Sequence, residues 1–348
     1  MERPAGIIQF VKVSELGEFG LIGLVTRIVD EAGVGAGASP DLIIGIGDDA
    51  AVWKENHRAQ VGTTDMLVQG VHFTLETISW QDLGWKSLAV NISDVAAMGG
   101  LPTYAMISLG LPADTLVEDI ADLYRGMARI CRQFNTTIVG GNLTETPVVI
   151  ISPTVIGTVE RDRILTRSAA RPGDKIAVTG CLGASSAGLK IMREKITLDP
   201  ETSALLEEAH RRPTPRVAQG QLLAQQGVRA AIDISDGLIA DLGHICEASR
   251  VQARVYADDV PIHPAVERAF GGDALKLAVV GGEDYELLFT APDEVIGDLR
   301  KSWKAAFPPF TVIGEIGEGI HGKVLLLNGD GKEIELHKGG WEHFRHSR

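Results

Sequence analysis

Apolar positions recur along the chain in short strand-like runs that alternate with longer helical segments. Helices are expected where apolar residues repeat every three to four positions, and strands where they alternate with polar residues or form short continuous runs. The pattern predicts helices over residues 18–31, 81–98, 115–134 and 238–249. It predicts strands over residues 41–46, 60–64, 104–109, 136–139, 148–159, 175–179 and 230–234. This alternation of elements favours an α/β (α+β) fold class.

A turn-rich segment divides the chain into two halves. Residues 168–174 combine Ser, Pro, Gly and Asp between two apolar runs, which is typical of a boundary. The length of 348 residues fits two domains, since a domain averages roughly 150 residues. We therefore expect domains over residues 1–165 and 166–348. In the second domain, Pro213 and Pro215 are expected to start a helix.

The charge balance narrows the classes of partner. The 46 acidic residues outnumber the 33 basic ones and give a formal net charge of −13, which argues against nucleic acid as the main partner. The three cysteines lack metal-ligand or redox spacing, so reduced thiols in a cytoplasmic protein are expected. Because the longest apolar runs are short or broken by proline, no membrane association is expected.

Acidic residues follow several of the predicted strands, beside glycine or hydroxyl residues. The segments that carry them are Gly45–Asp49, Thr63–Asp65, Asn91–Asp94, Asp233–Gly237 and Gly281–Glu286. Two like charges about 4 Å apart repel by on the order of 4 kcal/mol at an effective dielectric constant of about 20, so these segments would repel a bare phosphate. A phosphate that arrives with Mg²⁺ is accepted, because Mg²⁺ prefers oxygen ligands.

Each of these segments also has a simpler interpretation. Asp and Ser at the start of a helix are most often N-caps, and His72 taken alone is most often a hydrogen-bonded histidine without a ligand. Capping does not explain why the pattern repeats in widely separated segments, so together they predict a phosphate site with several metal ions. The glycine-rich loop of P-loop proteins and the His-Arg-Asp and Asp-Phe-Gly motifs of protein kinases are missing from the sequence.

The order of these motifs resembles the thiamine-monophosphate kinase family of the aminoimidazole ribonucleotide synthetase-like superfamily. The matching segments span nearly the whole chain in the order of the family: Glu15–Phe19, Gly45–Ala50, Thr64–Asp65, His72–Phe73, Lys86–Asp94, Ala96–Gly99, Gly140–Asn142, Thr166–Ser168, Asp233–Leu238 and Gly281–Leu287. The resemblance implies a two-domain fold whose N-terminal domain binds ATP and Mg²⁺ and forms the barrel of a homodimer. It also implies transfer of the γ-phosphoryl group of ATP to thiamine monophosphate.

The resemblance further implies roles for individual residues. The implied ligands of several Mg²⁺ ions are Asp49, Thr63, Thr64, Asp65, Asp94, Asn142, Asp233 and Asp236, of which Asp65, Asp94 and Asp236 are the implied catalytic residues. The implied ATP contacts are Tyr124, Gly141, Asn142, Arg167 and Ser235. The implied thiamine monophosphate contacts are His72, Glu283 and Trp341. Many family members have Asp where this chain has Asn142, whose amide oxygen still coordinates Mg²⁺ but adds no negative charge.

Two other functions compete with the kinase. Another ATP-dependent enzyme of the superfamily is one alternative: a selenophosphate synthetase would need a reactive cysteine near the N-terminus, yet Cys131 is the first cysteine, and a hydrogenase-maturation relative would need a C-terminal cysteine. An aminoimidazole ribonucleotide synthetase stays open, and a substrate-swap assay would separate it. A nucleotide-binding regulator without activity is disfavoured by the near-complete acidic set.

Overall fold

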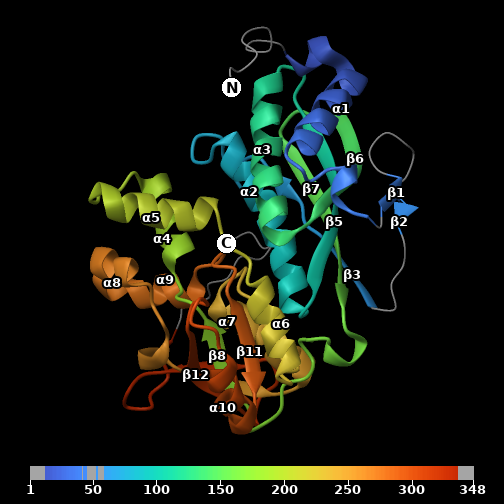
Figure 1. Cartoon of the computed structure of the whole chain (residues 1–348). Helices are drawn as coiled ribbons and strands as arrows, with labels where there is room; N and C mark the ends of the chain where they lie inside the picture. The colour runs from blue at the N-terminus through green and yellow to red at the C-terminus, as the bar shows by residue number, and fades with distance from the viewer. Residues whose placement is uncertain (1–11, 41, 45–51, 54–58, 336–348) are drawn as a thin grey trace. The chain divides into compact units, whose positions relative to one another are not determined.

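The computed structural model describes residues 12–40, 42–44, 52–53 and 59–335 (Figure 1). Contacts between Cα atoms divide the chain into two compact units. Unit 1 comprises Met1–Val95 and Pro102–Thr158, and unit 2 comprises Ala96–Leu101 and Val159–Arg348. The two units are described in turn.

Unit 1 is built on a mixed sheet with the strand order β3-β7-β5-β6, in which β4 also pairs with β7. Its strands are β1 (Leu42–Ile44), β2 (Val52–Trp53), β3 (Ala59–Thr64), β4 (Leu67–Val68), β5 (Leu101–Leu111), β6 (Thr137–Glu145) and β7 (Ile150–Val159). Its helices are α1 (Val13–Glu31), α2 (Trp80–Ala97) and α3 (Val117–Phe134). The strands β5 and β6 are parallel and are joined through α3, whereas β1 and β2 form a separate antiparallel pair.

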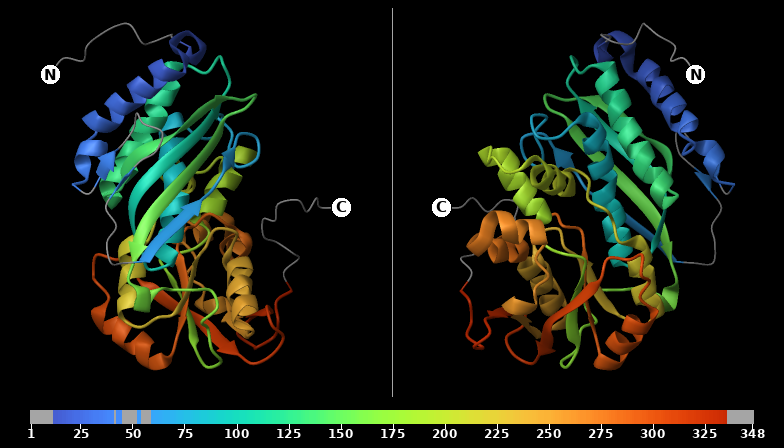
Figure 2. Two further views of the ribbon diagram at one scale, coloured as in Figure 1. Left: turned by 90° about the vertical axis from the view of Figure 1, so that its right-hand side faces the viewer. Right: turned by 60° about the vertical axis from the view of Figure 1, so that its left-hand side comes forward.

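The helices of unit 1 lie on one face of this sheet (Figure 2). The apolar stripe of α3 is buried, as its 3.6-residue spacing predicts, and includes Ile120, Leu123, Met127 and Ile130. The strand β7 alternates between buried and half-buried residues, which is the pattern of a strand with only one face in the core. This layer holds the end of β3 and the C-terminal half of α2 in fixed positions.

Unit 2 contains a second mixed sheet with the strand order β13-β10-β12-β8-β11-β9. Its strands are β8 (Lys175–Thr179), β9 (Ala230–Asp233), β10 (Gln252–Tyr256), β11 (Leu287–Ala291), β12 (Phe310–Gly317) and β13 (Val324–Leu327). Its helices are α4 (Ala184–Glu194), α5 (Pro200–Arg211), α6 (Val217–Gln225), α7 (Leu238–Ser249), α8 (Pro264–Phe270), α9 (Ala274–Val280) and α10 (Asp293–Ser302). The pair β10–β13 is parallel, and the other pairs are antiparallel.

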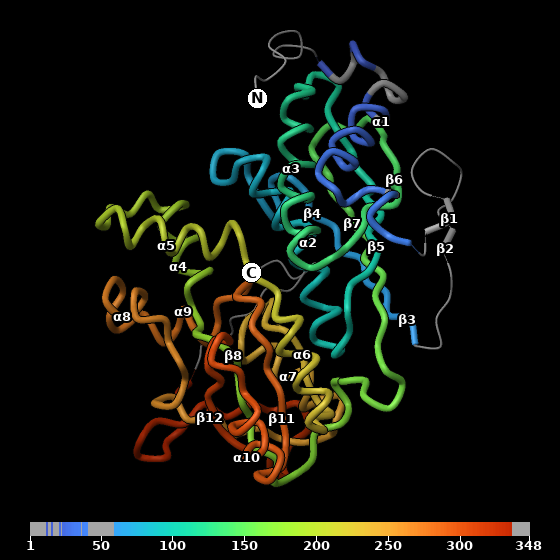
Figure 3. Tube along the Cα trace, viewed as in Figure 1, coloured from blue at the N-terminus to red at the C-terminus, as the bar shows by residue number. Residues whose placement is uncertain are grey.

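Both faces of the unit 2 sheet are covered by apolar cores, which explains its continuously apolar strands. Ile176 and Val178 of β8 pack into one core together with residues of α7, whereas Ala177 points into the opposite core with residues of α6 and α10. The trace in Figure 3 follows the chain from β9 directly into α7 and from α9 into β11. The two acidic segments of unit 2 therefore lie side by side at one end of the sheet, because Asp233 at the end of β9 pairs with Leu287 at the start of β11.

Each predicted helix and strand has a counterpart in the described residues, but α1 begins at Val13, before the predicted start at residue 18, and β6 continues to Glu145, beyond the predicted end at residue 139. Pro213 and Pro215 precede α6, which begins only at Val217, so the prediction that they start a helix is wrong. Pro200 and Pro264 instead take the first-turn positions of α5 and α8, where the missing N–H group costs nothing.

Among the described residues, none of the helices is long and apolar enough to cross a membrane. The thiols of Cys131 and Cys246 are buried and that of Cys181 is half-buried, and all three are free.

Candidate active site

In unit 1, the end of β3 meets the C-terminal half of α2. The hydroxyl group of Thr63 donates a hydrogen bond of 2.6 Å to Oδ2 of Asp94, and the backbone N–H of Asp65 donates one of 3.1 Å to Oδ1 of Asn91. Asn91 is fully buried and is fixed in turn by a bond from its amide nitrogen to the carbonyl oxygen of Ser87. Asn91 and Asp94 of α2 therefore both contact the end of β3.

The negative charges of the two carboxylates at this junction, Asp65 and Asp94, repel each other. Burial raises the pKa of Asp65 from 3.8 to about 6, and the negative charge of Asp94 adds to this rise. A cation bound by both carboxylates would remove both penalties, because it compensates the desolvated charge and the mutual repulsion. The oxygen-only donor set of carboxylates and the Thr63 hydroxyl fits Mg²⁺, which prefers such ligands.

Three other predicted residues of unit 1 also have a place in its packing, two through hydrogen bonds and one through burial. The hydroxyl of Thr64 donates to the carbonyl oxygen of Pro153 at 2.9 Å, across to β7. Nδ1 of His72 accepts a hydrogen bond of 3.0 Å from the N–H of Val68 and closes the loop after β4. Tyr124 is 4% exposed on the core-facing side of α3, and burial raises the pKa of its phenol. Their roles toward ligands stay predictions.

Gly141 and Asn142 lie on β6, in its exposed C-terminal half. Gly141 pairs with Ile107 of β5, and a Cβ atom at Gly141 would stand 1.9 Å from the carbonyl oxygen of Ile107. Only glycine allows the two strands to approach so closely. Asn142 pairs with Ser108 one position further and is exposed, so its amide is accessible to a ligand.

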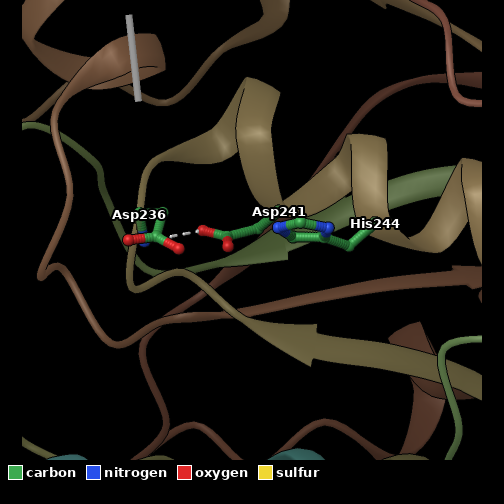
Figure 4. Close-up of side chains that lie close together, drawn as sticks. All are labelled: Asp236, Asp241 and His244. Carbon is green, nitrogen blue, oxygen red and sulfur yellow. Dashed lines mark hydrogen bonds between the residues drawn. The ribbon is translucent and has the colours of Figure 1, made fainter. Parts of the chain in front are cut away.

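In unit 2, Asp233 ends β9, and Ser235 and Asp236 lie in the turn that leads from β9 to α7. Its shape is set by Asp241 of α7, whose Oδ2 accepts hydrogen bonds from the N–H groups of Ser235, Asp236 and Gly237 at 3.0, 3.1 and 3.0 Å. Figure 4 shows Asp241 pointing at this turn, with Asp236 on one side of its carboxylate and His244 on the other. One ligand atom each from Asp236, Asp241 and His244 lies within 4.8 Å of the others.

Asp241 is the least accessible carboxylate of this turn. Its pKa is raised from 3.8 to about 8. Burial is the largest cause, the nearby charges of Asp233 and Asp236 add to the rise, and the hydrogen bonds from the N–H groups of Gly237 and Asp236 oppose it. The sequence prediction missed Asp241 and His244. For Asp241 the sequence did offer a signal: it is an acidic residue in the first turn of a helix that follows the acidic segment Asp233–Gly237.

The loop before β11 brings Glu283 beside the same turn. The N–H of Glu283 donates to the carbonyl oxygen of Ser235 at 2.8 Å, and that of Tyr285 donates to Ile234 at 2.9 Å. A Cβ atom at Gly282 would stand 2.2 Å from the carbonyl oxygen of Ser235, so glycine is needed for this approach. Glu283 and Tyr285 have positive φ angles of 66° and 51°, a costly backbone conformation that persists in functional loops when neighbouring contacts enforce it.

Arg167 lies at the other end of β9. The preceding residue, Thr166, bridges to Ala230 at the start of this strand, whereas Asp233 ends it about 10 Å further on, at roughly 3.3 Å per residue. Arg167 is exposed, and its carbonyl oxygen accepts a hydrogen bond of 2.8 Å from Ser249. Asp49 and Trp341 lie outside the described residues.

Each unit thus carries an acidic cluster, and two family models together match most of the chain. The family model "AIR synthase related protein, N-terminal domain" matches residues 47–159, and the model "AIR synthase related protein, C-terminal domain" matches residues 171–326. The fold is therefore that of the aminoimidazole ribonucleotide synthetase-like proteins.

Similar proteins narrow this class further. The chain is 36% identical over 338 residues to thiamine-monophosphate kinase of Aquifex aeolicus, with 96% of this chain and 100% of that protein covered. A crystal structure of thiamine-monophosphate kinase from Stenotrophomonas maltophilia K279a is 36% identical, with a TM-score of 0.78 over 91% of this chain and 98% of that chain. A structure described as "AaThiL complexed with AMPPCP and TMP" is 35% identical, with a TM-score of 0.74 over 96% of this chain and 99% of that chain. The chain belongs to the thiamine-monophosphate kinase family.

Proposed function

We propose that the acidic clusters of the two units carry out ATP-dependent phosphorylation of thiamine monophosphate to thiamine diphosphate. The chain is a thiamine-monophosphate kinase of thiamine biosynthesis, with ATP as its co-substrate. The observation that carries the site proposal is the junction of Thr63, Asp65 and Asp94, where two half-buried carboxylates are gathered at a cost that a bound cation would remove. The resemblance supports a cytoplasmic homodimer as the working form.

The reaction needs positioning and charge compensation more than a protein nucleophile. An oxygen of the thiamine monophosphate phosphate forms a bond to the γ-phosphorus of ATP, while the bond from that phosphorus to the β–γ bridging oxygen breaks. The electron pair of the broken bond stays on ADP, and the products are ADP and thiamine diphosphate. The attacking oxygen is already anionic, so no side chain has to remove a proton from it.

Mg²⁺, when bound, supplies the positive charge that lets two anionic substrates meet. In this proposal the residues that hold it are Asp49, Thr63, Thr64, Asp65, Asp94, Asn142, Asp233 and Asp236. The side chains of Asp65, Asp94 and Asp236 orient the phosphates at the reacting centre. The substrates are held by Tyr124, Gly141, Asn142, Arg167 and Ser235 on ATP and by His72, Glu283 and Trp341 on thiamine monophosphate.

A substrate-swap assay tests this proposal. The purified chain is incubated with Mg²⁺ and ATP, and with either thiamine monophosphate or the substrate of aminoimidazole ribonucleotide synthetase. We expect thiamine diphosphate and ADP in equal amounts from the first mixture and no ATP-dependent product from the second. A folded, metal-replete sample that leaves thiamine monophosphate unchanged would refute the proposal.

A further inference from the structure

Three carboxylates of the acidic loop Gly281–Glu286 of unit 2, those of Glu283, Asp284 and Glu286, contact three different elements. Asp284 accepts hydrogen bonds from the backbone N–H groups of Gly183 and Ser185, at 2.8 and 3.2 Å, where α4 begins. Glu286 is buried and accepts from Nε of Arg216, just before α6, at 2.6 Å. These contacts enforce the positive φ angles of the loop and explain why non-glycine residues keep them.

The third carboxylate, that of Glu283, is held from α5. Nδ1 of His210 lies 3.2 Å from Oε2 of Glu283 and 3.0 Å from Oγ of Ser185. The side chain of His210 is 8% exposed and that of Glu283 is 30% exposed, so the histidine supports the carboxylate from the protein interior while the carboxylate itself reaches solvent.

The contact with Glu283 favours a proton on Nδ1 of His210. An ionised carboxylate only accepts hydrogen bonds, so the nitrogen that faces it has to donate. With a proton on Nδ1, the ring directs a donor at Oε2 of Glu283, 3.2 Å away, and at Oγ of Ser185, 3.0 Å away. A hydrogen bond to an ionised acceptor is stronger than a neutral one, which makes it an effective way to fix the direction of a half-exposed side chain.

We propose that His210 is a positioning residue that orients the carboxylate of Glu283 toward thiamine monophosphate. This inference rests on the proposed function, in which Glu283 contacts that substrate. The backbone of Glu283 is fixed by its bond to Ser235, and its carboxylate is fixed by His210, so both ends of the side chain are set before the substrate arrives. Such preorganisation raises affinity because less side-chain freedom is lost on binding.

The simplest alternative is that His210 only fills space between α4 and α5. Two substitutions of similar size separate the two roles. His210→Asn places an amide nitrogen where Nδ1 stands and keeps the donor, whereas His210→Gln places it where Nε2 stands and removes the donor from Glu283. His210→Leu removes the donor altogether, and His321→Asn changes an exposed histidine in a distant loop and serves as the control.

The experiment measures KM for thiamine monophosphate, KM for ATP, kcat and the melting temperature of each variant. We expect His210→Leu and His210→Gln to raise KM for thiamine monophosphate on the order of tenfold, the effect of losing a charge-assisted hydrogen bond. KM for ATP should stay within about twofold, and His210→Asn should stay close to wild type. In a Glu283→Ala background, the same substitutions of His210 should cause no further rise, because their effect passes through Glu283.

Two results would overturn the role of His210. One is an unchanged KM for thiamine monophosphate in folded His210→Gln protein, and the other is an equal rise in KM with and without Glu283. If His210→Leu fails to fold, the comparison of Asn with Gln decides alone. Absence of both turnover and thiamine monophosphate binding by the wild-type chain would instead overturn the proposed function, and this inference with it.

Discussion

Replacing Asp94 with asparagine tests the acidic junction of unit 1. The change removes one negative charge but keeps an oxygen that accepts the 2.6 Å hydrogen bond from Thr63, so the contact between β3 and α2 survives. Because the charge of Asp94 contributes to the raised pKa of Asp65, the pKa of Asp65 should fall, although burial, the larger cause, still holds it above its ordinary value. The metal-free variant should therefore be at least as stable as wild type.

Activity should respond in the opposite direction. Loss of a charged ligand at a catalytic metal site should lower kcat/KM by at least about 100-fold, which corresponds to about 2.7 kcal/mol of transition-state stabilisation at 1.36 kcal/mol per factor of ten. The assay follows thiamine diphosphate formation at saturating ATP and increasing Mg²⁺ concentration, together with thermal unfolding with and without Mg²⁺. Stabilisation of the protein by Mg²⁺ should weaken in the variant.

Asp122→Asn provides the matched control. Asp122 is an exposed aspartate of α3 in the same unit that bonds Arg125 at 2.8 Å, so the same chemical change there should leave kcat/KM unaltered. An Asp94→Asn protein with wild-type kcat/KM at every Mg²⁺ concentration would refute the metal assignment. A variant that fails to fold would refute the reasoning on stability.

Three further predictions concern the stability of the scaffold around the site. The pKa of Asp284 is raised to about 7, with burial as the largest cause. In the unfolded chain this carboxyl group ionises near its ordinary pKa of about 4, so the folded state holds the proton more tightly. The free energy of unfolding should therefore fall as pH rises from about 4 to about 7, by on the order of 4 kcal/mol. Urea unfolding at pH 5 and pH 7.5 should show a shallower fall for Asp284→Asn than for wild type, and equal slopes would contradict the prediction. Gly141→Ala should destabilise the chain by roughly 1–3 kcal/mol and lower activity, because the added Cβ atom would stand 1.9 Å from a backbone oxygen of β5. In the control Gly140→Ala, the added Cβ atom meets nothing within 4 Å, so that variant should lose much less stability. Similar melting temperatures for the two variants would count against the close approach of the strands. Arg216→Met leaves the buried carboxylate of Glu286 without its guanidinium partner and should cost about 3–5 kcal/mol in urea unfolding, and a cost below about 1 kcal/mol would show that the pair is dispensable.

Local sequence signals predict most of the secondary structure because they report on residues close in the chain. The apolar stripe of α3 and the short runs that form β8 and β9 have the periodicities of their elements, so their positions follow from the sequence. Helix starts are less secure, as Pro213 and Pro215 show. Prolines fit the first turn of a helix, but they fit an extended connection equally well.

The acidic segments of the site are also visible in the sequence, but their supports are not. Asp241 bonds the turn just before α7, where its only signal is an acidic residue in the first turn of the helix. His210 reaches Glu283 from a helix 73 positions earlier in the chain. Only the contact of His210 joins distant segments, and such a contact leaves no local pattern in the sequence. A structure is needed to find residues that hold a functional side chain without touching a ligand.

A crystal structure with Mg²⁺, a non-hydrolysable ATP analogue and thiamine monophosphate tests the central claim most directly. The account predicts Mg²⁺ ions about 2.1 Å from carboxylate oxygens of Asp94 and Asp236 and from phosphate oxygens of the nucleotide, with thiamine monophosphate beside Glu283. Density for the nucleotide and metal away from these carboxylates, or thiamine monophosphate bound away from Glu283, would contradict it.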